Sequence, residues 1–126
     1  MADTSQLREY IAPEGTKLMS DALYDVAVER WRQVEEEGFL PEDDDLVFSG
    51  TLSRMGACYA THVSDFFDRD ELTRETLNEY QQAPFSEDWP GARCPWKPSF
   101  PRHDLVKAAA LILAEIERID RRGQYQ

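Results

Sequence analysis

The sequence predicts an all-α protein, a single-domain bundle of three or four helices with a long loop rich in proline and aromatic residues before the last helix. Two observations support this prediction. Apolar residues recur at helical spacing in several segments, and no segment shows the period-two alternation of a half-buried strand. The chain has 126 residues, 41% of them hydrophobic, which is enough to bury a core in one domain.

The first predicted helix runs from Asp21 to about Glu37. Ser20 precedes it as an N-cap, and Gly38 follows it as a stop signal. Apolar residues recur on one side of this helix and polar residues on the other, so we expect an amphipathic helix. The expected buried side holds Leu23, Val26, Ala27, Trp31 and Val34. The expected solvent side holds Asp25, Glu29, Arg32, Gln33 and Glu36.

The second predicted helix begins at Ser49 or Thr51 and ends near Phe67. Gly56 lies inside it, where a glycine is either tolerated or allows a neighbouring element to approach closely. The apolar residues again recur at helical spacing. The expected buried stripe consists of Leu52, Met55, Gly56, Tyr59, Val63 and either Phe66 or Phe67.

The third predicted helix runs from about Arg69 to Gln82, and its apolar stripe is weak. Asp68 stands three residues before a glutamate, which is the spacing of a capping box. Ahead of the first helix, the chain shows no sustained period. We therefore divide the protein into an N-terminal arm over residues 1–19 and an all-α domain over residues 20–126.

A long loop precedes the last helix. Residues 83–101 contain five prolines, which exclude both a helix interior and a central strand. We expect its aromatic side chains to fold the loop back onto the helices. The last helix spans about Arg102 to Arg122, and its apolar middle, residues 108–114, is expected to be surrounded by the other helices. The aromatic residues of the loop are Phe85, Trp89, Trp96 and Phe100.

Charge and composition narrow the possible partners. The formal net charge of −11, from 25 acidic and 14 basic residues, repels phosphate backbones and acidic lipid, so we expect neither direct nucleic-acid binding nor membrane binding. No window approaches the ~20 apolar residues of a membrane span, and no signal-peptide pattern opens the chain. Cys58 and Cys94 form no metal or redox motif. We expect a cytoplasmic protein with free thiols.

An acidic group at the end of the first predicted helix is a candidate metal site. Carboxylates from a helix and the following loop suit Mg²⁺ or Ca²⁺. The run of aspartates at residues 43–45 lacks the spacing of an EF-hand, so a solvated acidic face is the competing interpretation. We interpret His62 and Asp65, three residues apart, as a surface pair rather than a shared metal or proton site. The candidate metal ligands are Glu29, Glu36, Glu37 and Asp44.

The proline loop supplies a candidate ligand site. Tryptophans stack on nucleobases, and neighbouring arginine or lysine side chains contact phosphates. Lys107 has two interpretations, an ion pair with Asp104 or a contact to a ligand phosphate or carboxylate. No motif names a catalytic nucleophile. The candidate ligand-binding residues are Arg30, Gln33, Trp89, Arg93, Trp96, Lys97 and Lys107.

Four motifs resemble a family of small bacteriophage and prophage proteins. They read ERxRQ at residues 29–33, EGFxPExDD at 37–45, WKP at 96–98 and DLVKAAALILAEIER at 104–118. The resemblance covers residues 22–122, and its C-terminal motif is specific. It implies a phage accessory protein in the cytoplasm of a bacterial host, without an established reaction.

A looser likeness is to the all-α NTP pyrophosphohydrolases of the MazG type, whose paired helices offer four carboxylates to Mg²⁺. The pair Glu117 and Asp120 is similar to one half of their acidic motif, and Glu29 or Glu36 would supply the other half. The chain departs from that pattern, because nearly the whole domain separates its two acidic groups.

Three functions follow from these patterns. The favoured one is a phage accessory protein that binds a small phosphorylated ligand, a nucleotide or nucleotide signal, for sequestration or counter-defence. Its site would lie between the loop over residues 89–97, the acidic end of the first helix and Lys107. The alternatives are a Mg²⁺-dependent MazG-like pyrophosphohydrolase and an inhibitor whose acidic stretch, residues 35–45, docks on a basic host protein. Apolar residues of the first helix, such as Tyr24 and Val28, also allow a homo-oligomer.

Overall fold

Four helices account for most of the structure, a computed structural model. It describes residues 20–35, 50–67, 73–84, 88–90 and 96–123. Within these ranges every regular element is a helix, so the all-α prediction is confirmed. The helices are α2 (Asp21–Glu35), α4 (Thr51–Phe67), α5 (Arg74–Gln82) and α6 (Pro101–Arg122).

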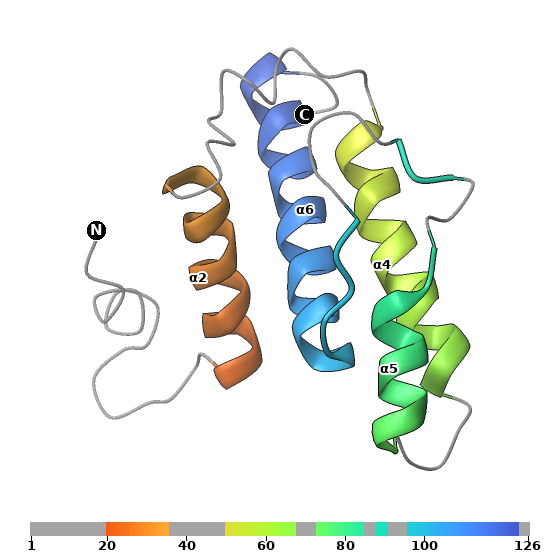
Figure 1. Cartoon of the computed structure of the whole chain (residues 1–126). Helices are drawn as coiled ribbons and strands as arrows, with labels where there is room; N and C mark the ends of the chain where they lie inside the picture. The colour runs from red at the N-terminus through yellow and green to blue at the C-terminus, as the bar shows by residue number, and fades with distance from the viewer. Residues whose placement is uncertain (1–19, 36–49, 68–72, 85–87, 91–95, 124–126) are drawn as a thin grey trace.

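Helix α6 occupies the middle of the bundle. Figure 1 shows α2 on one side of it and α4 on the other, with α5 beside α4. The segment over residues 96–100 runs along α4 and α6 before it enters α6. This arrangement gives α6 two packing faces, one toward α2 and one toward α4, and places the loop segment at the α4 face.

The helix termini follow local capping rules. The Ser20 hydroxyl accepts a hydrogen bond from the backbone N–H of Leu23 at 3.1 Å, so this predicted N-cap is confirmed. Helix α6 begins one residue earlier than predicted, at Pro101, because proline at the first helical position loses no hydrogen bond. It ends at Gly123, whose positive φ of 67° suits a glycine C-cap.

The start of α5 differs from the prediction. The described helix is capped by Thr73, whose hydroxyl accepts a hydrogen bond from the N–H of Thr76 at 3.2 Å, and it begins at Arg74 rather than Arg69. The proposed cap Asp68 lies outside the described residues. Extended backbone at Thr73 prevents a continuous helix over 69–82, and capping-box spacing in the sequence did not reveal this.

The hydrophobic core lies between α4 and α6. The predicted stripe on α4 is confirmed for Leu52, Met55, Gly56, Tyr59 and Val63, all of which are buried. A Cβ atom at Gly56 would stand 2.9 Å from the carbonyl oxygen of Ala108, so the glycine allows the two helices to approach closely. In the same cluster, α6 contributes Ala108, Leu111 and Ala114.

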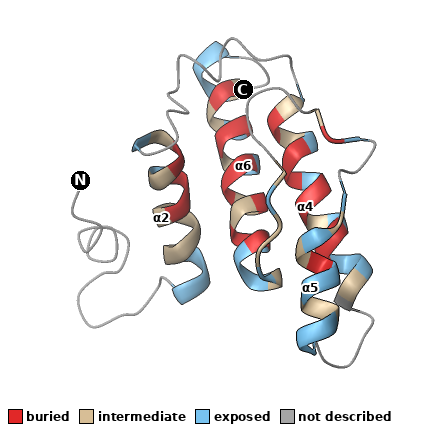
Figure 2. Ribbon diagram, in the orientation of Figure 1, coloured by how far each residue is buried: buried red, intermediate tan, exposed pale blue. Residues whose placement is uncertain are grey.

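The predicted burial of α2 is wrong for Leu23 and Trp31, while Val26, Ala27 and Val34 are half-buried. Figure 2 shows that its buried residues lie near the C-terminal end of the helix. They are the polar residues Glu29, Arg30 and Gln33, whereas Leu23 and Trp31 are 49% and 41% exposed. An ion pair explains why polar residues are buried in place of apolar ones. Arg30 contacts Glu117 on α6, so α2 packs against α6 through its polar side.

Two further burial predictions fail. Helix α6 is not surrounded by the described helices, which pack on two of its sides and leave Ile112 and Ile116 42% and 50% exposed. In the loop, Trp89 is buried and Trp96 is partly buried, as expected. Phe100 is 55% exposed, because it occupies the N-cap position of α6 with extended backbone. Phe85 lies outside the described residues.

Candidate ligand-binding pocket

Three aromatic side chains join the loop to α4. The Trp96 indole stacks on the ring of Tyr59, with centroids 4.8 Å apart and an interplanar angle of 26°. Trp89 meets the same tyrosine edge to face at 5.5 Å. Trp96 Nε1 donates a hydrogen bond to the carbonyl oxygen of Ala83 at 3.1 Å. These contacts fix the position of the Trp96 ring against α4 and satisfy its polar atom.

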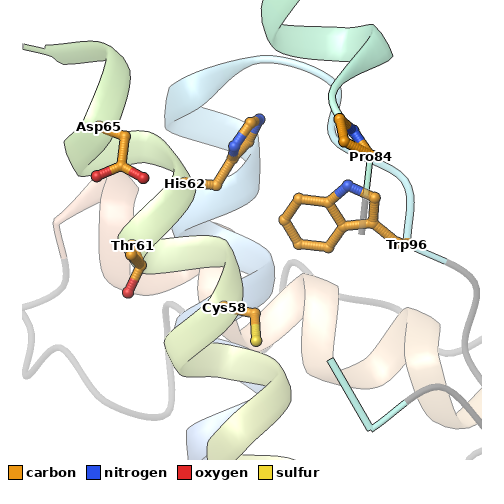
Figure 3. A pocket seen from close by; sticks show the side chains of 6 residues that line it. All are labelled: Cys58, Thr61, His62, Asp65, Pro84 and Trp96. Atoms are coloured by element: carbon orange, nitrogen blue, oxygen red, sulfur yellow. The ribbon is translucent and has the colours of Figure 1, made fainter. Parts of the chain in front are cut away.

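A pocket of about 230 Å³ lies beside Trp96. One wall is a face of α4, because its four lining residues are spaced as i, i+3, i+4 and i+7. Figure 3 shows the opposite wall, formed by the rings of Pro84 and Trp96. The α4 residues that line it are Cys58, Thr61, His62 and Asp65.

His62 has a defined protonation pattern at this pocket. Its Nε2 lies 2.8 Å from the carbonyl oxygen of Tyr80, which only accepts hydrogen bonds, so Nε2 carries the proton. The ring also stacks on Tyr80 at 4.3 Å and meets Trp96 edge to face at 5.1 Å. In the neutral imidazole, Nδ1 therefore carries a lone pair and acts as an acceptor.

Asp65 and Thr61 complete the polar lining. Both are exposed, and among the described residues neither the Asp65 carboxylate nor the Thr61 hydroxyl has a hydrogen-bond partner. An ionised carboxylate only accepts hydrogen bonds. The lining thus offers acceptor atoms on the α4 wall and aromatic surface on the Trp96 wall.

A buried network around Asp104 holds the loop segment against α6. The Asp104 carboxylate accepts hydrogen bonds from the Tyr80 hydroxyl at 2.5 Å and from the Ser99 N–H at 3.0 Å. Lys107 Nζ pairs with it at 3.0 Å and donates to the carbonyl oxygen of Lys97 at 2.6 Å. The ion-pair interpretation of Lys107 is confirmed, and this ammonium positions the backbone next to Trp96.

Two further sets of polar contacts lie along α6, one toward α2 and one toward α4. Arg30 Nε contacts a Glu117 carboxylate oxygen at 2.7 Å. On α6, Arg118 donates to Glu115 at 2.7 Å, and Ser53 of α4 donates to the same carboxylate at 3.1 Å. Burial alone would raise the pKa of Glu115, but these hydrogen bonds and the positive charge of Arg118 outweigh it and lower the pKa.

The buried glutamate and glutamine of α2 make their polar contacts within that helix. Glu29 accepts from Arg32 Nε at 2.8 Å, from Arg32 Nη2 at 2.7 Å and from Gln33 Nε2 at 3.2 Å. The expectation that Glu29 and Gln33 face solvent is wrong, because these contacts compensate their burial. The amide oxygen of Gln33 is buried and has no hydrogen-bond partner among the described residues.

The structure separates the predicted site residues into two groups. Trp89, Trp96, Lys97 and Lys107 gather where the loop meets α4 and α6. The α2 candidates Glu29, Arg30 and Gln33 lie near the C-terminal part of α6, where Glu117 stands ten residues beyond Lys107, or about 15 Å along a helix. Arg93, Glu36, Glu37 and Asp44 lie outside the described residues.

Sequence reasoning missed the α4 wall of the pocket. His62 is buried rather than part of a surface pair, because it packs between Tyr80 and Phe66. Its spacing from Cys58 and Asp65 places all three on one helix face, and this signal was present in the sequence. The position of Trp96 opposite that face could not be predicted from the sequence.

The described residues hold no group of three metal-ligating side chains, and none of their helices is both long and apolar enough to cross a membrane. Comparison with protein-family models, curated protein sequences and solved structures finds no match to this chain.

Proposed function

We propose that the protein binds a small phosphorylated ligand of the nucleotide type and that the base of this ligand occupies the pocket beside Trp96. The observation that carries the proposal is the pairing of a fixed indole with hydrogen-bonding groups on the facing helix wall (Figure 3). On the basis of the resemblance to phage proteins, we propose that this binding takes place in the cytoplasm of a bacterial host and sequesters the ligand.

The aromatic wall favours a planar ring. Base stacking on tryptophan contributes about 1–3 kcal/mol per base. Tyr59 stacks on the Trp96 indole and prevents it from collapsing into the pocket, so part of its surface stays available for a ligand. Preorganisation of this kind reduces the entropy lost when a ligand binds.

The size of the pocket favours a base rather than a whole nucleotide. A volume of about 230 Å³ corresponds to roughly eight water molecules, and it is smaller than the ~300–1,000 Å³ of pockets for drug-sized ligands. The sugar and phosphates would therefore lie outside it. This division agrees with the lining as far as the structure describes it, because none of its described residues is cationic.

The nearby lysines differ in what they offer to a phosphate. Lys107 already contacts Asp104, the Lys97 carbonyl and the Tyr59 ring, from which its Nζ lies 4.5 Å. Lys97 is exposed and directly follows Trp96, so its ammonium is the cation best placed among the described residues to meet a phosphate outside the pocket. Phosphate binding would contribute less to affinity than base stacking.

Binding without turnover is better supported than hydrolysis. In the MazG-like alternative, Mg²⁺ would be held by the pair Glu117 and Asp120 and by Glu29 or Glu36. The carboxylates of Glu29 and Glu117 are already paired with Arg32 and Arg30. A guanidinium that pairs with a carboxylate competes with a metal ion for the same oxygens. The third alternative, an acidic docking surface, concerns a stretch of which the structure describes only Glu35, and its salt dependence remains its test.

Calorimetric titration with nucleosides, nucleoside monophosphates and triphosphates tests the proposal, with product analysis of each mixture in the presence of Mg²⁺. We expect micromolar to millimolar binding of at least one compound that stays intact. Thr61→Met should weaken this binding, because the longer side chain fills the pocket. Ser64→Met is the matched control, since Ser64 is exposed on the same helix and does not line the pocket.

Each outcome separates the alternatives. Binding that Thr61→Met weakens and Ser64→Met leaves unchanged supports the pocket. Release of pyrophosphate from a triphosphate would establish the MazG-like enzyme instead. If no compound binds the protein, the nucleotide proposal fails.

A further inference from the structure

We infer that the pocket beside Trp96 selects a guanine-type base, one that presents two adjacent N–H donors to the carboxylate of Asp65. This inference rests on the proposed function and names the base that the same site would take. Its basis is the set of hydrogen-bonding atoms that line the pocket, which is rich in acceptors.

Three side chains define the polarity of the lining. The Asp65 carboxylate supplies two acceptor oxygens and has no partner among the described residues. When the His62 imidazole is neutral, its Nδ1 carries a lone pair, because Nε2–H is donated to the Tyr80 carbonyl. The Thr61 hydroxyl can accept or donate. A ligand that satisfies this lining must bring donors.

The common bases differ in the edges that they present. Guanine carries a ring N–H beside an exocyclic amino group, so two parallel donors can meet the two oxygens of one carboxylate. Adenine and cytosine place a ring acceptor next to the amino group, which would repel the second oxygen. Uracil has a single imide N–H between two carbonyl acceptors. Only guanine matches a carboxylate in a bidentate manner.

The charge of Asp65 also limits what enters the pocket. A phosphate placed against this carboxylate would be repelled, and the protein carries a net charge of −11. A neutral base that donates two hydrogen bonds stabilises the ionised carboxylate instead. The same residue therefore favours the base of a nucleotide and disfavours its phosphate.

Nucleosides provide the sharpest test, because they carry no phosphate and differ only in the base. Calorimetry and quenching of tryptophan fluorescence would give the dissociation constants of guanosine, inosine, adenosine and uridine. Inosine keeps the ring N–H and lacks the amino group, so we expect it to bind about 10- to 100-fold more weakly than guanosine. Adenosine and uridine should bind more weakly by at least a similar factor.

Asp65→Asn tests the carboxylate directly. The amide replaces one acceptor with a donor, so guanosine should bind at least tenfold more weakly and its advantage over adenosine should disappear. Asp65 is exposed, so the variant is expected to fold, and circular dichroism checks this. Glu75→Gln, a substitution with the same charge change at an exposed position in the first turn of α5, should leave the dissociation constants unchanged.

The failure of this inference differs from the failure of the proposed function. If several nucleosides bind with equal affinity, or if Asp65→Asn leaves the preference for guanosine intact, the inferred guanine selection by Asp65 is wrong. The proposed nucleotide binding is not affected by either result. If no nucleoside or nucleotide binds, both are overturned.

Discussion

The hydroxyl of Tyr80 donates a 2.5 Å hydrogen bond to Oδ2 of Asp104, and both residues are completely buried. This bond joins α5 to the first turn of α6 and lies directly under the ring of His62, which stacks on Tyr80. The same carboxylate accepts hydrogen bonds from Ser99, at the end of the loop segment that carries Trp96. A buried ionic network, and not apolar packing alone, therefore supports the His62 ring and the loop segment that carries Trp96.

Removal of the Tyr80 hydroxyl should destabilise the fold. Tyr80→Phe deprives the buried Asp104 carboxylate of one hydrogen bond, and bonds to a charged group contribute about 1.5–3 kcal/mol. Urea unfolding at pH 7 would measure a loss of that order. A double-mutant cycle with Asp104→Asn provides the control, because the two substitutions should be non-additive. Strictly additive losses would show that the two groups do not interact.

The same tyrosine predicts a loss of stability at alkaline pH. Burial, together with the hydrogen bond and negative charge of Asp104, raises the pKa of Tyr80 far above its ordinary value of about 10. Above pH 10 the unfolded chain releases this proton while the folded protein retains it, so the free energy of unfolding falls as pH rises.

Urea midpoints measured from pH 8 to pH 11 would check this dependence. The stability advantage of the wild type over Tyr80→Phe should shrink above pH 10, because the other tyrosines titrate in both proteins and cancel in the difference. A constant advantage across this range would mean that Tyr80 ionises in the folded state at an ordinary pKa.

The lowered pKa of Glu115 predicts that the free energy of unfolding falls as the pH is lowered into the acid range. Its pKa is lowered despite burial, because Arg118 and Ser53 hydrogen-bond to the ionised carboxylate. The stabilisation is therefore present above the unfolded pKa of about 4.3 and is lost as pH falls through the lower folded value. In urea unfolding from pH 7 to pH 3, the advantage of the wild type over Glu115→Gln should stay level at first and shrink below about pH 4. An advantage that grows toward pH 3 would contradict the direction of the shift.

Gly56→Ala should destabilise the protein although alanine is the better helix former. At an open helical position this substitution gains about 1 kcal/mol. Here the new Cβ would stand 2.9 Å from the backbone oxygen of Ala108 and 3.0 Å from Cγ1 of Ile112, so α4 and α6 must separate. We expect a net loss of about 1–3 kcal/mol in urea unfolding. Ser64→Ala, at an exposed position of α4, is the control and should not lower stability. Equal or higher stability of Gly56→Ala would disprove the close contact.

The fold was predictable where one side of a helix carries apolar residues and the other does not. The stripe from Leu52 to Val63 on α4 and the extent of α6 follow from periodicity and capping, which are local properties of the chain. The prediction failed on α2, where Trp31 is exposed and Gln33 is buried. A prediction from periodicity assumes that the apolar residues are the buried ones. It does not take account of an ion pair between helices, such as that of Arg30 with Glu117.

The candidate site was predictable only in part. The proline loop indicated that Trp96 folds back onto the helices, and the spacing of Asp104 and Lys107 indicated their ion pair. The role of His62 was missed, because its burial depends on Tyr80, which is 18 residues away in sequence and on another helix. Local spacing within α4 cannot reveal a partner that belongs to another helix.

The sequence by itself determined that this protein is an all-α domain, because helical periodicity, N-caps and prolines act over a few residues and do not depend on the rest of the fold. Only the tertiary structure decided which polar residues are buried and which side chains face one another across the pocket. Burial of Glu29 and Asp104 is tolerated because each meets cationic partners or hydrogen-bond donors at a particular distance. Those distances are set by the packing of α2, α4 and the loop around α6.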